Sequence, residues 1–197
     1  MKIFLAARVA CAATLLAAMS CARSDDGAKA DTAAGASSDS MAGMAAMPGM
    51  NRPAAKDADH EFLRNMIDHH EGFIQMAMAA MTKASKPETQ GDAHNGHTKQ
   101  ADEQTKMIVD VQSMYGETVT PMMMPMHKAM NDSLQAMSGA EYDRAFYRNV
   151  IAHHRDGIKM TDALLPRLAK PEVKRMAEKM KAEQQKEITA FERKAKG

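Results

Sequence analysis

The sequence contains an internal repeat, and this feature restricts the possible folds more than any other. Residues 59–76 read DHEFLRNMIDHHEGFIQM and residues 143–160 read DRAFYRNVIAHHRDGIKM, so nine of 18 positions are identical at an offset of 84 residues. Apolar residues in both segments recur with helical rather than alternating spacing. The repeat therefore predicts a duplicated helical unit, and no β-strand is expected.

A second helix is predicted after each copy of the repeat. Periodic segments run from about Lys99 to Tyr115 and from about Pro171 to Lys194, the latter with a proline at the start, where a missing N–H costs little. We expect a polar loop over residues 83–98, and a proline-rich loop with a short helix over about Lys128–Met137. Two such hairpins predict an all-α four-helix bundle over residues 57–197.

The N-terminal region differs in composition from the predicted bundle. Residues 1–20, MKIFLAARVACAATLLAAMS, have the basic start and short apolar run of a secretory signal peptide, and the run is too short to span a membrane. Cleavage before Cys21 fits ordinary signal peptidase, and it also fits a bacterial lipoprotein site at which Cys21 would carry a lipid anchor. Residues 21–56 are rich in Ala, Gly, Ser, Asp and Met, which predicts a disordered linker. A periplasmic location is expected, either free or anchored to the membrane.

The charge balance argues against nucleic-acid binding, and the cysteine content argues against a disulfide or a thiolate site. The 26 basic residues balance 25 acidic ones, so the basic footprint of a nucleic-acid-binding protein is absent. Cys11 would leave with the signal peptide and Cys21 would become the N-terminus, so neither an internal disulfide nor a thiolate site is expected. The 21 methionines stand out instead, and any soft-metal chemistry would use methionine and histidine.

Each copy of the repeat carries two adjacent histidines within a broad apolar arc of its helix. A buried neutral imidazole needs both a donor and an acceptor partner, which metal ligation or a polar network across the bundle can supply. Histidine and methionine seven residues apart are separated by about 10 Å along a helix, so one ion would take ligands from neighbouring helices. Both members of each pair lie within the arc, so either can face the bundle axis. The candidate ligands in the repeats are His60, Met66, His69, His70, Met76, His153, His154 and Met160.

Further candidate ligands lie outside the repeats. The linker stretch MAGMAAMPGM places a methionine at every third position, at Met41, Met44, Met47 and Met50. Thioethers bind Cu(I) and Ag(I) well and hard cations poorly, so this segment is interpreted as a mobile capture arm; low-complexity sequence is the alternative. The segments HNGH and PMMMPMH add His94, His97, Met122, Met123, Met124, Met126 and His127.

The repeats also resemble a known protein family. FLRNMIDHHEGFIQMA (62–77) and FYRNVIAHHRDGIKM (146–160) are similar to the His-His motif of a bacterial domain-of-unknown-function family, and residues 172–191 resemble its following helix. The resemblance implies a ferritin-like four-helix bundle and, as in the best-understood members, periplasmic copper binding linked to copper resistance. It implicates the two His-His pairs with Met76 and Met160. Asp156 departs from the motif, which usually has glycine at that position, and the tryptophan often found near the helix ends is missing.

These features together predict a copper-binding protein rather than an enzyme. The protein would sequester Cu(I), and also Cu(II) or Ag(I), or pass copper to an exporter or chaperone. One alternative is a structural or interaction bundle of the cell envelope without a metal role. Another is a di-iron oxidase, but such sites use Glu-x-x-His motifs, and none ends at any histidine of the two His-His pairs.

Overall fold

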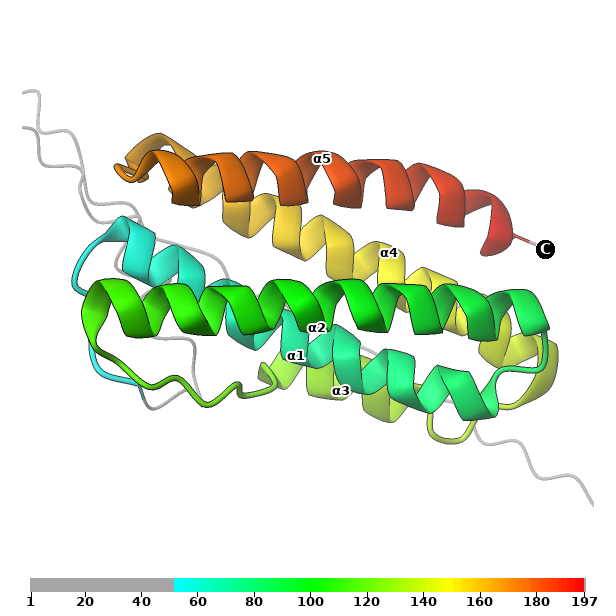
Figure 1. Ribbon diagram of the computed structural model, residues 1–197. Helices are drawn as coiled ribbons and strands as arrows, with labels where there is room; N and C mark the ends of the chain where they lie inside the picture. The colour runs from blue at the N-terminus through cyan, green and yellow to red at the C-terminus, as the bar shows by residue number, and fades with distance from the viewer. Residues whose placement is uncertain (1–51, 197) are drawn as a thin grey trace, which may run out of the picture. The chain divides into compact units, whose positions relative to one another are not determined.

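The computed structural model describes residues 52–196, which form α-helices joined by loops (Figure 1). A short 3₁₀ turn, Leu165–Arg167, follows α4, and no β-strand occurs within the described range. No helix in this range is both long enough and apolar enough to cross a membrane. The helices are α1 (Ala58–Lys83), α2 (Pro87–Tyr115), α3 (Pro125–Ser133), α4 (Gly139–Leu164) and α5 (Pro171–Lys194).

The four long helices form two hairpins that pack through their first helices. Helix α2 runs back along α1, α5 runs back along α4, and α1 packs against α4 (Figure 1). This arrangement confirms the expected all-α, ferritin-like four-helix bundle of two repeated hairpins. The short helix α3 packs against α1 and begins three residues earlier than the sequence predicts.

The bundle core consists of two apolar clusters with a polar layer between them. One cluster joins Phe62 and Met66 of α1 to Met160 and Leu164 of α4. The other joins the later part of α1, from Phe73 onward, to the earlier part of α4. Helices α1 and α4 are therefore antiparallel, and the middle turn of each helix carries the His-His pair of its repeat.

Each repeat caps a helix of the other repeat. Asp59 on α1 accepts hydrogen bonds from the backbone N–H groups of Ala169 (3.2 Å) and Lys170 (3.1 Å), just before α5 begins. Its repeat mate, Asp143 on α4, accepts from the backbone N–H groups of Ser85 (3.0 Å) and Lys86 (3.5 Å), just before α2 begins. Both carboxylates are buried, and they satisfy helix-terminal donors that lack intrahelical partners. The duplication is thus visible as a pair of reciprocal caps.

The predicted polar loop over residues 83–98 is wrong, because α2 begins at Pro87. Two features stabilise the helix despite its polar sequence. Pro87 stands at the first helical turn, and Thr89 and Ala93 are fully buried against neighbouring helices. Gly96 lets α2 approach α1 closely, since a Cβ atom there would lie 2.7 Å from the ring of Phe73. Tertiary packing therefore overrides the low helix propensity of this segment.

The chain preceding α1 contacts the bundle over residues 52–57. Arg52 donates to both carboxylate oxygens of Asp68, at 2.9 and 2.6 Å, and to the carbonyl oxygen of Thr120 at 2.6 Å. Asp57 caps α1 by accepting from the N–H of His60. The sequence analysis assigns residues 52–56 to the linker, and in the structure Arg52 ties this stretch to α1 and to the loop before α3.

Candidate metal centre

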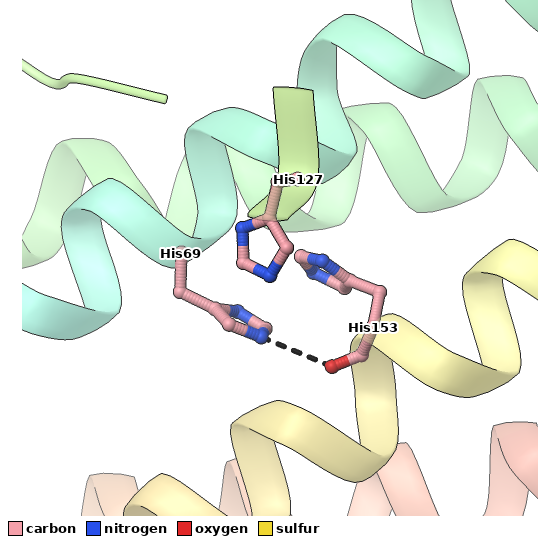
Figure 2. A group of neighbouring side chains, drawn as sticks. All are labelled: His69, His127 and His153. Carbon is pink, nitrogen blue, oxygen red and sulfur yellow. Dashed lines mark hydrogen bonds between the residues drawn. The ribbon is translucent and has the colours of Figure 1, made fainter. Parts of the chain in front are cut away.

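Three imidazoles from three different helices meet in the polar layer of the bundle. His69 comes from α1, His127 from α3 and His153 from α4, and Figure 2 shows their rings facing one another. One ring nitrogen from each lies within 4.8 Å of the others, and all three side chains are buried. The ring centroids of His69 and His153 are 3.8 Å apart, and His127 lies 4.8 and 4.6 Å from them.

Several nitrogens of this cluster have no hydrogen-bond partner within residues 52–196. Nε2 of His69 donates to the carbonyl oxygen of His153 at 3.0 Å (Figure 2), which leaves the lone pair on Nδ1 of His69. That Nδ1 and both ring nitrogens of His153 are buried without a partner. Both ring nitrogens of His127 are also without a partner, and since buried polar atoms are normally satisfied, five such nitrogens at one place fit a metal-binding site.

Burial keeps the two repeat histidines of the cluster in the form that binds metals. Loss of solvent lowers the pKa of His69 and of His153 well below the usual value, and the neighbouring imidazoles lower both further. Both rings are therefore neutral at physiological pH, and neutral imidazole is the ligating species.

Two glycines allow the three rings to converge. A Cβ atom on Gly72 would lie 2.5 Å from Cβ of His127, so this glycine lets α3 lie directly on α1. A Cβ atom on Gly157 would lie 2.8 Å from the ring of His69, so this second glycine opens α4 to that ring. Asp156, the departure from the family motif, places a carboxylate oxygen 3.5 Å from Nε2 of His127. A carboxylate at this distance can orient a ligating imidazole.

The second histidine of each pair faces the other helix of its own hairpin. Nε2 of His70 lies 2.9 Å from Oε2 of Glu103 on α2, and Nε2 of His154 lies 2.8 Å from Oε2 of Glu187 on α5. Burial opposes ionisation of Glu187, but His154 and Lys99 outweigh it and lower its pKa to about 2. The choice within each pair that the sequence leaves open is thus resolved: His69 and His153 meet, while His70 and His154 contact carboxylates.

The sequence analysis missed the roles of Glu103 and Glu187, although a signal for both was present. The two glutamates are separated by 84 residues, the same offset as the repeats. The tripeptide Lys-Pro-Glu also recurs at this offset, at residues 86–88 and 170–172. Extending the repeat beyond the first helices would have located both the start of α2 and the two carboxylates.

The other predicted ligands of the repeats lie outside the three-imidazole cluster. Met66 and Met160 pack in one apolar cluster of the core, and Met76 packs in the other. His60 lies near the start of α1, where its ring stacks on Tyr115 with centroids 4.2 Å apart. Its Nε2 lies 3.0 Å from a carboxylate oxygen of Glu117.

Among the remaining predicted ligands that lie within residues 52–196, His127 joins the cluster. His94 and His97 lie on α2 rather than in a turn, and His94 is exposed. In the segment before and within α3, Met124 is buried in the core and Met126 is 43% exposed. The structure places Met122 and Met123 in the loop before α3, both half-buried. The signal peptide, Cys21 and the methionines Met41, Met44, Met47 and Met50 lie outside the described residues.

Comparisons with known proteins agree with the duplicated bundle. The family described as "Domain of unknown function (DUF305)" matches the chain twice, over residues 9–109 and 108–194. A solved structure described as CopM in the Cu(II)-bound form is 27% identical with a TM-score of 0.62, and the match covers 70% of this chain and 95% of that one. CopM has also been solved in Cu(I)-bound and Ag-bound forms.

A second solved structure is a putative secreted DUF305 protein from Streptomyces coelicolor. It is 25% identical with a TM-score of 0.62, and the match covers 70% of this chain and 91% of that one. No protein of curated function matches the sequence. Because the family match spans both hairpins, the chain belongs to the DUF305 family.

Proposed function

We propose that this protein binds copper in the bacterial cell envelope, and that His69, His127 and His153 form its central site. The observation that carries the proposal is the convergence of three buried imidazoles, with one ring nitrogen of each within 4.8 Å of the others, in a cluster where most ring nitrogens lack a hydrogen-bond partner within residues 52–196. A bound ion would accept these lone pairs and remove the cost of burying them.

The ligand set and the relatives favour copper over other metals. Three neutral imidazoles suit Cu(I), Cu(II) and Zn(II), and Cu(II) binds such sites more tightly than the other divalent ions of its row. The likeness to CopM, solved with Cu(II), Cu(I) and Ag, supports copper as the ion handled here. The methionine arm at Met41, Met44, Met47 and Met50 would add soft ligands that catch Cu(I).

Binding rather than catalysis is the proposed activity. The three-imidazole cluster includes no carboxylate ligand, whereas di-iron oxidases on this bundle depend on several glutamates. The protein would hold copper in the periplasm, free or anchored through Cys21, or pass it to an exporter or chaperone. Either role would protect the cell against excess copper.

The proposal is tested by an anaerobic Cu(I) titration against a competing chromophoric chelator. Replacing His127 by Leu removes one ligand from the short helix α3 and leaves the two repeat histidines in place. We expect this variant to bind its tightest Cu(I) about tenfold or more weakly than the wild type. His94→Leu is the matched control, because His94 is an exposed histidine on α2.

A variant with Met41, Met44, Met47 and Met50 replaced by Leu separates the arm from the centre. We expect it to lose weaker Cu(I) binding and to keep the tightest ion. No competitive Cu(I) uptake by the wild type, or equal uptake by the wild type and His127→Leu, would refute the three-imidazole centre.

A further inference from the structure

A pocket separate from the three-imidazole cluster lies between α2, α4 and α5. It has a volume of about 140 Å³, and its lining includes the aromatic rings of Phe73, Phe146 and Phe191. His154 and Glu187 line it as well, so the pocket reaches the His-Glu pair of the second repeat, in which His154 is buried and Glu187 is half-buried. The proposed copper centre uses neither of these two residues.

The charged side chains that line this pocket are two carboxylates, Asp92 and Glu187, and one ammonium group, Lys99. Nζ of Lys99 lies 2.9 Å from Oε2 of Glu183 and 2.8 Å from Oε1 of Glu187, and so bridges the two carboxylates. Asp92 accepts from the hydroxyl of Tyr147 at 2.7 Å and from Nζ of Lys194 at 2.5 Å. Nζ of Lys179 also lies 3.7 Å from the other carboxylate oxygen of Glu183, so each of the three carboxylates has an ammonium partner with which a bound cation must compete.

His154 supplies an independent sign of a ligand at this place. Its residue exposure is 1%, and its Nδ1 has no hydrogen-bond partner within residues 52–196. Its Nε2 lies 2.8 Å from Oε2 of Glu187, while Oε1 of the same carboxylate contacts Lys99. The imidazole, the carboxylate and the ammonium group all line the pocket.

We propose that this pocket is a second metal site, which takes a borderline divalent cation such as Zn(II) or Cu(II). His154 and Glu187 are the principal ligands, Glu183 adds a carboxylate oxygen, and a bound ion displaces the ammonium group of Lys99. One imidazole with carboxylate oxygens is a ligand set that Zn(II) and Cu(II) accept and that Cu(I) disfavours. The site therefore differs in chemistry from the three-imidazole centre.

The pseudo-symmetry of the bundle provides a matched control. The first repeat has the same kind of pair, His70 with Glu103, but Glu103 lines a different pocket with residues of the first half of α5. The position of Lys99 in the first repeat is taken by Glu183 in the second, so the two pairs differ in their charged neighbours. Glu103→Gln changes the equivalent His-Glu pair at a residue that does not line the proposed site.

The test is a Co(II) titration of the full chain, followed by its visible absorption and by Zn(II) competition. Thioethers bind these ions poorly, and a His127→Leu background leaves the central site with two imidazoles, which weakens its binding of divalent ions. In this background we expect one Co(II) ion to bind, and Glu187→Gln to lower its affinity about tenfold or more, while Glu103→Gln leaves it unchanged. Lys99→Met removes the competing ammonium group and should raise the affinity about tenfold.

The Lys99→Met variant keeps the test independent of folding defects, because a misfolded protein would not gain affinity. The second site is refuted if the His127→Leu background binds no Co(II), or if Lys99→Met does not tighten binding. Equal effects of Glu187→Gln and Glu103→Gln would also overturn it. None of these outcomes depends on Cu(I) binding at the three-imidazole centre, so the two proposals fail separately.

Discussion

At the residue scale, the buried histidines of the candidate metal centre make the stability of the metal-free protein depend on pH. His69 and His153 have a pKa well below the usual value in the folded state, because burial disfavours the charged ring. In the unfolded chain both would titrate near the ordinary value of about 6.5. The unfolded state therefore binds more protons than the folded state once the pH falls below that value.

The sign of this difference gives a testable pH dependence. The contribution of both histidines is fully present above about pH 6.5, and it is lost as the pH falls from there towards the folded-state pKa. Each histidine should lower the free energy of unfolding by about 1.4 kcal/mol per pH unit over that range. Urea unfolding of the metal-free protein at several pH values measures the slope.

Variants assign the slope to the cluster. His153→Leu removes one titrating ring and should reduce the slope between pH 6 and pH 5 by about 1.4 kcal/mol per unit. His94→Leu should leave it unchanged, because His94 is exposed in the folded state as well. A wild-type slope that His153→Leu does not alter would contradict the neutral, buried state of this ring.

The sequence predicts His69, His127 and His153 as ligands, but it does not predict that these three residues form one cluster. The repeat places His69 and His153 correctly, because helical periodicity puts both in the apolar arc that faces the core. It cannot separate His69 from His70, since adjacent helical positions differ by about 100° and the arc covers both. The sequence predicts His127 as a ligand together with the neighbouring methionines. Only the packing of α3 on α1 brings His127 to the repeat histidines.

At the element scale, α3 determines whether the centre has two imidazoles or three. The helix is short, spanning Pro125–Ser133, and it packs against α1. Asn131 donates to the carbonyl oxygen of Gly72 at 3.3 Å, and Asn149 of α4 donates to the carbonyl oxygen of Met130 at 3.0 Å. A change in the surface of α1 under His127 should therefore displace α3 while the four long helices remain in place.

Gly72→Ala makes this change with one methyl group. The new Cβ would lie 2.5 Å from Cβ of His127, so α3 must move away and carry its imidazole with it. We expect tight Cu(I) binding to weaken about tenfold, while far-UV circular dichroism keeps its helical signal. Alanine also favours a helix over glycine by about 1 kcal/mol, so a loss of helix is not expected.

Gly91→Ala on α2 is the matched control for this substitution. A Cβ at Gly91 would meet no atom within 4 Å, so the same replacement should stabilise the protein by about 0.5–1 kcal/mol without changing Cu(I) affinity. Equal Cu(I) affinities for Gly72→Ala and Gly91→Ala would show that α3 does not need its close contact with α1. Gly72, Gly96 and Gly157 lie inside helices where each allows close contact with another element, and sequence patterns alone do not distinguish them from Gly91.

At the scale of the whole molecule, the duplication predicts both the architecture and its cooperativity. The repeat alone is enough to predict a bundle of two hairpins, because each hairpin must cover the apolar arc of the other. The reciprocal caps of Asp59 and Asp143 could not be predicted in the same way, although both residues are identical between the repeats. Which N–H groups they meet depends on the antiparallel packing of α1 on α4.

These caps allow a test of whether the two repeats unfold as one unit. Asp59→Ala removes the cap of α5, and Asp143→Ala removes the cap of α2. Each should lower the free energy of unfolding by about 1–2 kcal/mol, since each leaves buried helix-terminal N–H groups without an acceptor. The caps lie at the starts of two antiparallel helices, so the losses should add within about 0.5 kcal/mol in the double variant.

The number of unfolding transitions, rather than their midpoint, shows whether the two repeats unfold as one unit. Each cap joins one hairpin to the other, so unfolding of either hairpin would break contacts that the other hairpin makes. We therefore expect urea unfolding of the wild type and of all three variants to remain a single transition, with circular dichroism and tyrosine fluorescence coinciding. Two separated transitions, with Asp143→Ala shifting one and Asp59→Ala the other, would mean that each repeat folds as an independent hairpin. The three-imidazole centre would then lie between two independently folding units, whereas a single transition makes it part of one cooperative core.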